Sequence, residues 1–149
     1  MLVDEYNVAG QAYPSTLEED LKIDKFDVSS EFIKHSETYG WYSTAYELAM
    51  DYEARIKSKL ERVYALIDVR VRAQMNNASV RITEKKVENT VITDPEYVEL
   101  QSLYQDAKRD TGLLKAARDA MQAKKDCLIS LGANMRAEWS SEPSIKHRM

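Results

Sequence analysis

Apolar side chains recur at every seventh position along the second half of the chain. "TDPEY" is a strong helix start, with Asp94 or Thr93 at the cap and Pro95 in the first turn. We therefore expect a helix that runs from there to about Gly132 or Trp139. A seven-residue apolar repeat is typical of helices that pack along a coiled-coil-like seam. The repeat comprises Leu100, Ala107, Leu114, Met121, Leu128 and Met135, with Leu103, Ala117 and Leu131 between some of them.

The first half of the chain carries two similar apolar series. One contains Tyr42, Ala49, Ile56 and Val63, and the other contains Tyr39, Tyr46, Leu60 and Ile67. We expect a helix capped by Ser29 or Ser30 that runs to about Met75, with Gly40 as a candidate break and "NNAS" as the stop. Two long helices with matching seams predict a long antiparallel helical hairpin, coiled-coil-like, in an all-α protein.

Shorter segments flank this hairpin. "STLEEDLKID" offers Ser15 and Thr16 as caps for a short N-terminal helix. The connector "VRITEKKVENTVITD" is ambiguous, because Val80 and Ile82 favour a strand whereas Thr83 before "EKKVEN" favours a short helix. We expect a flexible arm over residues 1–14, a single helical domain over 15–139 and a flexible tail over 140–149. Two long helices leave much apolar surface exposed, so the domain should assemble into an oligomer.

The stretch "YGWYSTAYELAMDY", residues 39–52, concentrates aromatic side chains. Base stacking on such rings needs cations nearby to hold the phosphates. No Lys or Arg lies between Lys34 and Arg55, and acidic residues lie within and beside the stretch. Packing against the hairpin partner and another subunit is therefore favoured over base stacking. The rings concerned are Tyr39, Trp41, Tyr42, Tyr46 and Tyr52.

Charge changes the functional picture. The net charge is −4, but residues 1–52 carry eleven acids and three lysines, whereas residues 53–93 carry nine bases and five acids. An acidic whole argues against coating DNA by bulk charge. A local basic surface in the middle of the chain is still compatible with this balance.

The cations of that middle region form the candidate DNA-binding set. Their spacing allows two interpretations: a helix face that follows a phosphate backbone, or a solvated face with pairs such as Glu53–Lys57. Arg70 continues the series of Val63, so it marks the end of the bundle or turns its charge towards a groove. Arg55, Lys59 and Arg62 share a face, Lys57 lies nearby, Arg70 and Arg72 close the helix, and Arg81, Lys85 and Lys86 follow it.

Signals for catalysis are poor. The only histidines are His35 and His147, the only cysteine is Cys127, and the chain has no GxxxxGK[ST] phosphate loop and no GxSxG elbow. We therefore expect no enzyme, no metal and no cofactor. No window approaches the apolar length of a membrane span, and the acidic start does not read as a secretory signal. A cytoplasmic setting is the expectation.

The order of these segments resembles the UvsY-type recombination mediators of bacteriophages, over about residues 16–138. The matching segments are "LEEDLKID", a tyrosine-containing first helix, "ALIDVRVR" at its end, "ITEKKVENTVITDPEYV" before the last helix, and "LKAARDAMQAKKDCLISL" along it. The resemblance implies a non-enzymatic protein of the host-cell cytoplasm that binds single-stranded DNA and forms ring-like homo-oligomers. It also implies two protein partners, a RecA-like recombinase and a single-strand-binding protein. DNA-contacting residues of the family correspond to Arg70 and Arg72.

A second interpretation needs no nucleic acid. A helical oligomer with wide apolar faces and an acidic N-terminal region also suits an adaptor or structural protein that binds other proteins. Salt dependence separates the two, because binding to phosphates weakens steeply with salt and apolar self-association does not.

Overall fold

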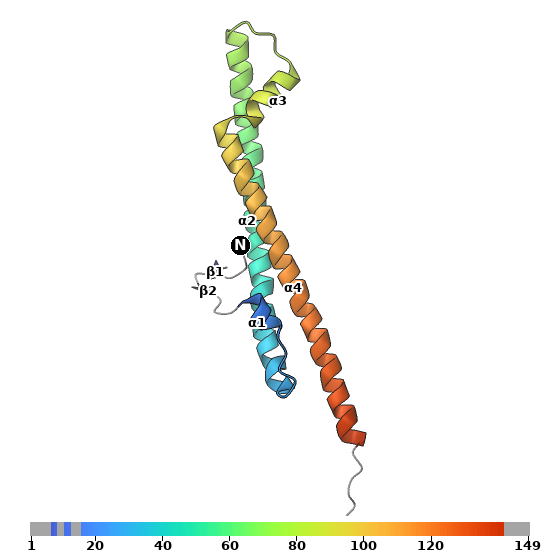
Figure 1. Ribbon diagram of the computed structural model, residues 1–149. Helices are drawn as coiled ribbons and strands as arrows, with labels where there is room; N and C mark the ends of the chain where they lie inside the picture. The colour runs from blue at the N-terminus through green and yellow to red at the C-terminus, as the bar shows by residue number, and fades with distance from the viewer. Residues whose placement is uncertain (1–6, 9–10, 13–15, 142–149) are drawn as a thin grey trace, which may run out of the picture. The chain divides into compact units, whose positions relative to one another are not determined.

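The computed structural model describes residues 7–8, 11–12 and 16–141. Two short antiparallel strands, β1 (Asn7–Val8) and β2 (Gln11–Ala12), pair Asn7 with Ala12 and Val8 with Gln11. They lie within the arm predicted over 1–14, the rest of which falls outside the described residues. Four helices follow: α1 (Leu17–Leu21), α2 (Val28–Asn77), α3 (Glu84–Ile92) and α4 (Pro95–Ser141) (Figure 1). Residues 142–149 of the predicted tail lie outside the description as well.

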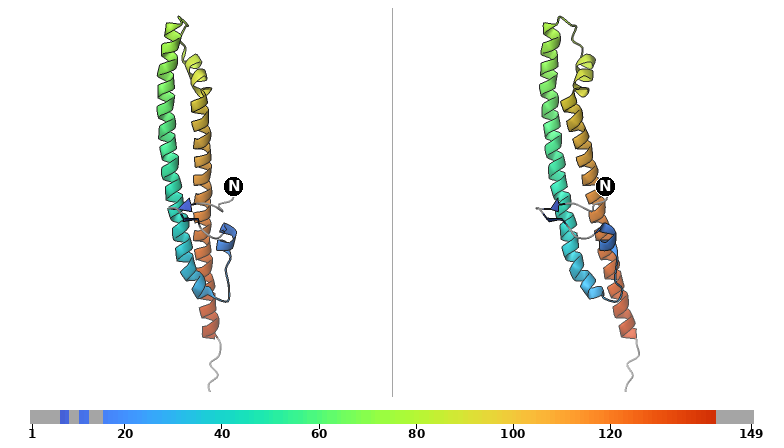
Figure 2. Two further views of the ribbon diagram at one scale, coloured as in Figure 1. Left: turned by 90° about the vertical axis from the view of Figure 1, so that its left-hand side faces the viewer. Right: turned by 60° about the vertical axis from the view of Figure 1, so that its left-hand side comes forward.

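The predicted all-α hairpin is confirmed, since α2 and α4 pack against each other as antiparallel helices. Figure 2 shows α2 and α4 side by side from two further directions. None of the helices in residues 16–141 has an apolar stretch sufficient to cross a bilayer.

The helix starts follow from short polar side chains. The Thr16 hydroxyl accepts a hydrogen bond from the Glu19 N–H at the start of α1. At the start of α2, the Asp27 carboxylate accepts from the Ser30 N–H at 3.1 Å. The prediction of Ser29 or Ser30 as this cap is therefore wrong. α2 also runs through Gly40 without a break, because a single glycine costs a helix only about 1 kcal/mol.

The connector resolves as a helix. Ser79 has a φ of 56°, a left-handed conformation that ends α2, and Thr83 then caps α3 by accepting from the Lys86 N–H. Asp94 accepts from the Glu96 N–H at 3.0 Å and so caps α4, with Pro95 as its first residue. The helical alternative for the connector is correct, and "TDPEY" acts as the predicted start signal.

Residues 1–46 with 114–149 form one compact unit, here unit 1, and residues 47–113 form a second, unit 2. Unit 2 lies wholly within the predicted domain 15–139, and unit 1 extends beyond that domain at both ends. The seven-residue series supplies part of each core, and Val87 and Val91 of α3 add to the core of unit 2. Buried side chains of unit 1 include Tyr42, Ala45, Leu114, Ala117, Met121 and Leu128. The core cluster of unit 2 comprises Leu60, Val63, Ile67, Val71, Val87, Val91 and Leu100.

A buried lysine of α4 holds the end of α1 against α4 in unit 1. The Lys124 ammonium donates to the backbone oxygens of Asp20 and Lys22, both at 2.7 Å, and lies 2.8 Å from Glu31 Oε2. Only 4% of the Lys124 side chain is exposed. The buried Tyr42 hydroxyl donates to the Asp20 carboxylate at 2.9 Å. These contacts, together with the buried ring of His35, form what we call the N-terminal clasp.

Candidate nucleic-acid interface

The exposed face of α2 in unit 2 carries the predicted cation series. Arg55, Lys59 and Arg62 are all exposed and recur at i, i+4 and i+7, which places them on one side of a helix. They cover about 10 Å along the axis at ~1.5 Å per residue. Arg55 pairs with Asp51 at 2.7 Å. Within residues 16–141, neither Lys59 nor Arg62 forms an ion pair with a carboxylate.

Aliphatic side chains continue the same face. Leu66 is 65% exposed and Val69 is 67% exposed, and they follow Lys59 and Arg62 at seven-residue intervals. We call Arg55, Lys59, Arg62, Leu66 and Val69 together the α2 outer stripe. Cations at one end and aliphatic groups at the other give a surface that can hold phosphates beside an apolar contact.

Arg70 and Arg72 do not face the same way. Two residues in a helix differ by about 200° around its axis, so the two side chains leave α2 on opposite sides. Arg70 Nη2 lies 2.6 Å from Asp94 Oδ2, just ahead of α4. Arg72 Nε lies 2.8 Å from Asp68, and its two Nη atoms contact Glu84 of α3 at 3.1 and 2.6 Å.

The hydrogen bonds between Arg72 and Glu84 favour the ionised form of both side chains. Hydrogen bonds to Glu84 and then to Asp68 raise the pKa of the Arg72 guanidinium above its ordinary value. The hydrogen bond from Arg72, followed by its charge, lowers the pKa of the Glu84 carboxyl. Both groups therefore stay ionised at neutral pH. Arg70, predicted either to end the bundle or to turn its charge towards a groove, pairs with Asp94, and half of its side chain stays exposed.

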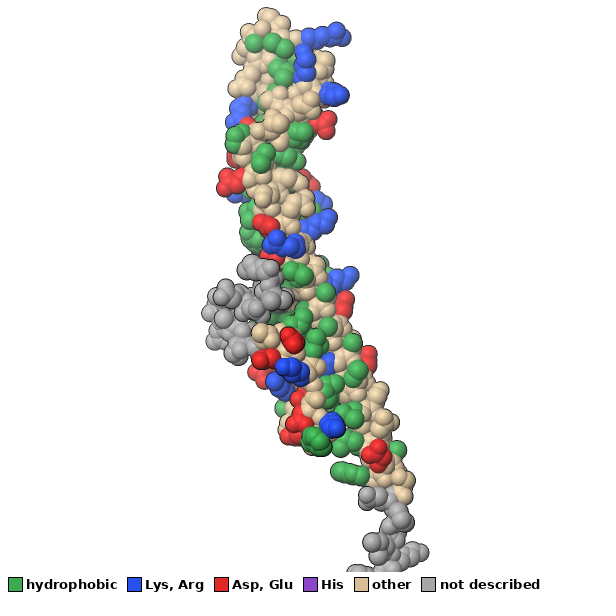
Figure 3. Space-filling view, in the orientation of Figure 1, with side chains coloured by type: hydrophobic (Ala, Val, Ile, Leu, Met, Phe, Trp, Pro, Cys, Tyr) green, Lys and Arg blue, Asp and Glu red, His purple; other side chains and the backbone are tan. Residues whose placement is uncertain are grey.

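The remaining candidate cations lie at exposed positions of unit 2. Arg81 lies in the α2–α3 connection, Lys85 and Lys86 lie in the first turn of α3, and Lys57 lies on α2. Figure 3 shows Lys and Arg side chains gathered where α2, the connection and α3 meet. Within the described part of the chain, these four residues form no ion pair with a carboxylate. The pair between Glu53 and Lys57, which the interpretation as a solvated face offered as an example, is not among the ion pairs of the described residues.

The aromatic stretch lies mostly in packed surroundings. Tyr42 is 1% exposed, Trp41 meets its ring edge-on at 4.8 Å, and Tyr39 stacks on His35 at 5.8 Å. The Arg118 guanidinium lies 4.4 Å from the centre of the Tyr46 ring. Tyr52 differs, since 48% of it is exposed.

Two features were not found from the sequence. The first is the N-terminal clasp, whose signal is Lys124 at the vacant seven-residue position between Ala117 and Leu131. The second is a shallow pocket of about 250 Å³ in unit 2, lined by Leu60, Glu61, Tyr64 and Tyr97. The rings of Tyr64 and Tyr97 meet edge-on at 5.8 Å. Its signal was only that Tyr64 follows the seam residue Val63 and that Tyr97 precedes the seam residue Leu100 by three positions, which does not specify a pocket.

A metal centre has no basis in the part of the chain that the structure describes, because no group of three His, Cys, Asp or Glu side chains comes together there. His147 lies outside the described residues, and His35 is buried. Cys127 is exposed on α4. No family model, curated protein or solved structure matches the chain. The resemblance to recombination mediators therefore rests on the sequence motifs alone.

Proposed function

We propose that this protein is a non-enzymatic, single-stranded-DNA-binding recombination mediator. In this role it helps a RecA-like recombinase load onto DNA that is covered by a single-strand-binding protein. The two protein partners and a ring-like homo-oligomer come from the sequence resemblance. The observation that carries DNA binding is the α2 outer stripe, in which Lys59 and Arg62 are exposed and ion-paired with no carboxylate of residues 16–141.

Spacing on the stripe suits a flexible strand. Cations 4–6 Å apart along the helix axis, from the ~1.5 Å rise per residue, can meet successive phosphates without contacting base edges. Binding is then independent of base sequence and falls steeply with salt. A single stripe has few cations, so several subunits together supply the affinity through multivalency.

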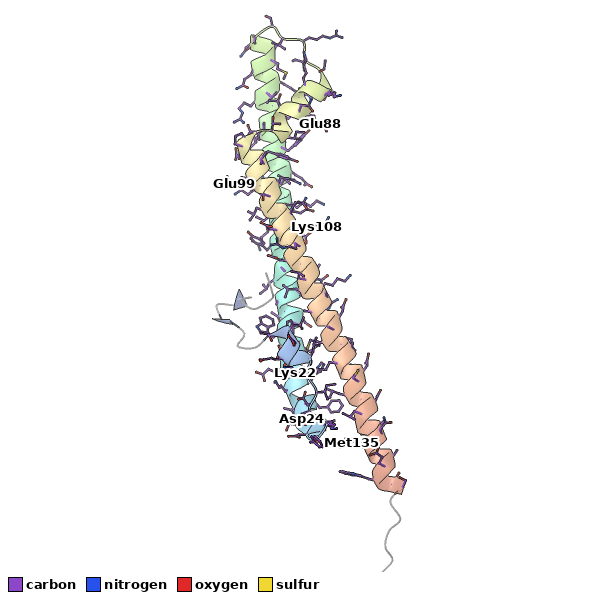
Figure 4. All side chains as sticks on the ribbon, in the orientation of Figure 1. Lys22, Asp24, Glu88, Glu99, Lys108 and Met135 are labelled. Carbon is purple, nitrogen blue, oxygen red and sulfur yellow. The ribbon has the colours of Figure 1, made fainter. Side chains whose placement is uncertain are left out.

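The test is fluorescence anisotropy of labelled oligo-dT, titrated at two salt concentrations with the Lys59→Ala/Arg62→Ala variant. Each lost phosphate contact reduces affinity about fivefold at ~0.1 M salt and makes the log–log salt slope about 0.7 shallower. The matched control is Lys108→Ala/Lys115→Ala, which removes two exposed cations from α4 and leaves the stripe intact. Lys108 is labelled in Figure 4.

Equal losses in both variants would mean that net charge, rather than the stripe, governs binding. Wild-type protein that binds no oligo-dT, at concentrations where light scattering shows an assembled oligomer, would refute the DNA-binding proposal.

The second candidate is a helical adaptor that binds proteins. It is favoured by the exposed apolar residues of the stripe, Leu66 and Val69, for which an apolar partner surface is the natural contact. This role gives self-association that persists in high salt and no retention on DNA cellulose. Sedimentation velocity at low and high salt distinguishes it from the mediator.

A further inference from the structure

Two arginines near the end of α2 hold the two ends of α3. Arg72 grips Glu84, the first residue of α3, with both Nη atoms, and Arg70 grips Asp94, two residues beyond the end of α3. Because the two arginines leave α2 on opposite sides, α3 is fastened from both flanks. Between these fastenings, Val87 and Val91 are 1% and 0% exposed in the core of unit 2.

A carboxylate and a phosphate compete for the same face of a guanidinium. Both accept two parallel N–H donors, so a pair of Nη atoms that serves one cannot serve the other. On Arg72 the Nη pair serves Glu84, while Asp68 is bound through Nε. Replacing Glu84 with a phosphate therefore leaves the Asp68 contact in place, and that contact keeps the guanidinium oriented.

The Glu84 contact is also the one that exchanges most readily. The Glu84 side chain is 84% exposed, compared with 25% for Asp68. An ion pair in water is weak, since solvent screens it and both side chains lose freedom. A phosphate chain that meets several cations at once has the greater electrostatic attraction and can displace it.

We propose that Glu84 and Asp94 are internal competitors that occupy Arg72 and Arg70, so that single-stranded nucleic acid reaches these arginines only by displacing them. Displacement breaks the ion pairs at both ends of α3, so that only the packing of Val87 and Val91 in the core of unit 2 keeps α3 in place. This inference rests on the proposed function, because it needs a phosphate ligand in unit 2. It goes further by assigning regulation to two carboxylates for which the sequence analysis predicted no part in DNA binding.

The experiment compares Glu84→Gln with wild type in oligo-dT anisotropy titrations. Glutamine keeps the size of the side chain and removes its charge, and we expect binding about three- to fivefold tighter, the strength of one exposed ion pair. The matched control is Glu88→Gln, an exposed acid of α3 that contacts no arginine among the described residues (Figure 4). It makes the same change in net charge. In an Arg72→Ala background, the gain from Glu84→Gln should disappear.

A second measurement follows α3 itself. Saturating oligo-dT should speed amide hydrogen exchange of α3 in the wild-type protein, because its fastenings are lost. Unchanged or slower exchange of α3 would overturn the displacement of Glu84.

The outcomes separate this inference from the proposed function. Wild-type binding with no more gain from Glu84→Gln than from Glu88→Gln overturns the competition and leaves the DNA-binding role standing. A gain that persists in the Arg72→Ala background overturns it too. Binding by neither protein refutes the proposed function and this inference with it.

Discussion

Replacing Lys124 with methionine tests the N-terminal clasp. Methionine keeps most of the buried stem and removes the ammonium, so little cavity is created. The change removes two hydrogen bonds of 2.7 Å to backbone oxygens and leaves Glu31 without its cation. The contacts to Lys124 anchor the end of α1, because the acceptors are Asp20 in its last turn and Lys22, its C-cap.

The magnitude follows from burial. Hydrogen bonds to a charged group contribute ~1.5–3 kcal/mol each, and removal of one partner from a buried ion pair costs ~3–5 kcal/mol. These figures overlap because they describe the same ammonium. Glu31 retains 15% exposure of its side chain, so water compensates it in part. We expect a loss of about 3 kcal/mol in the free energy of unfolding, with Tm lower by roughly 10 °C.

Urea unfolding followed by circular dichroism measures the loss. The control is Lys125→Met, which removes the charge of the exposed neighbouring residue and should change the free energy of unfolding by less than about 0.5 kcal/mol. A loss below about 1 kcal/mol for Lys124→Met would refute the reasoning, because three contacts to a buried ammonium cannot be so weak.

Acid should reduce this difference. Burial raises the pKa of the Glu31 carboxyl. The Lys124 ammonium and the Asp24 N–H together lower this pKa by more, so the net shift is downward. Because the pKa of Glu31 is lower in the folded protein, its ionised carboxylate stabilises the fold at pH values above its usual pKa of 4.5. This stabilisation is lost as the pH falls through the lower pKa of the folded state. The gap between wild type and Lys124→Met therefore narrows below about pH 4.5.

The remaining predictions concern both cores. Burial first, and then Lys124 and Lys125, lower the pKa of His35, while Glu31 opposes them. Neither ring nitrogen of His35 has a hydrogen-bond partner among the described residues. The unfolded chain binds this proton more readily, so stability should fall as the pH drops below about 6.5, and His35→Phe should flatten that decline in urea titrations. In unit 2, Ile67→Ala should cost about 2–5 kcal/mol, because Ile67 is 2% exposed, whereas exposed Leu66→Ala should cost under ~1 kcal/mol. Equal losses at residues 66 and 67 would contradict the assignment of the buried face.

The buried faces could be predicted because periodicity records them directly. Leu114, Met121 and Leu128 are 0% exposed at the seven-residue positions that the pattern marked. Caps were less predictable, since Asp27, Ser29 and Ser30 all offer suitable oxygens and only tertiary context selects Asp27. Gly40 shows the same limit, because a long packed helix tolerates the local cost of one glycine.

The candidate site was predictable as a set of cations and not as an arrangement. Helical spacing alone grouped Arg55, Lys59 and Arg62 correctly. The partners of Arg70 and Arg72 depend on where α3 lies, with contacts 24 and 12 residues away in the chain. Local patterns carry no information about which distant carboxylate meets a given guanidinium.

The two units differ in how their segments follow one another along the chain, and therefore in when each unit is completely synthesised. Unit 2 is one continuous segment, residues 47–113, so its contacts close over short loops. Unit 1 joins the two ends of the chain, and the contact between Lys124 and Asp20 spans 104 residues. All of unit 2 is therefore synthesised before Lys124, and the N-terminal clasp between α1 and α4 can form only afterwards. Local contacts form faster than distant ones, so we expect unit 2 to fold before unit 1.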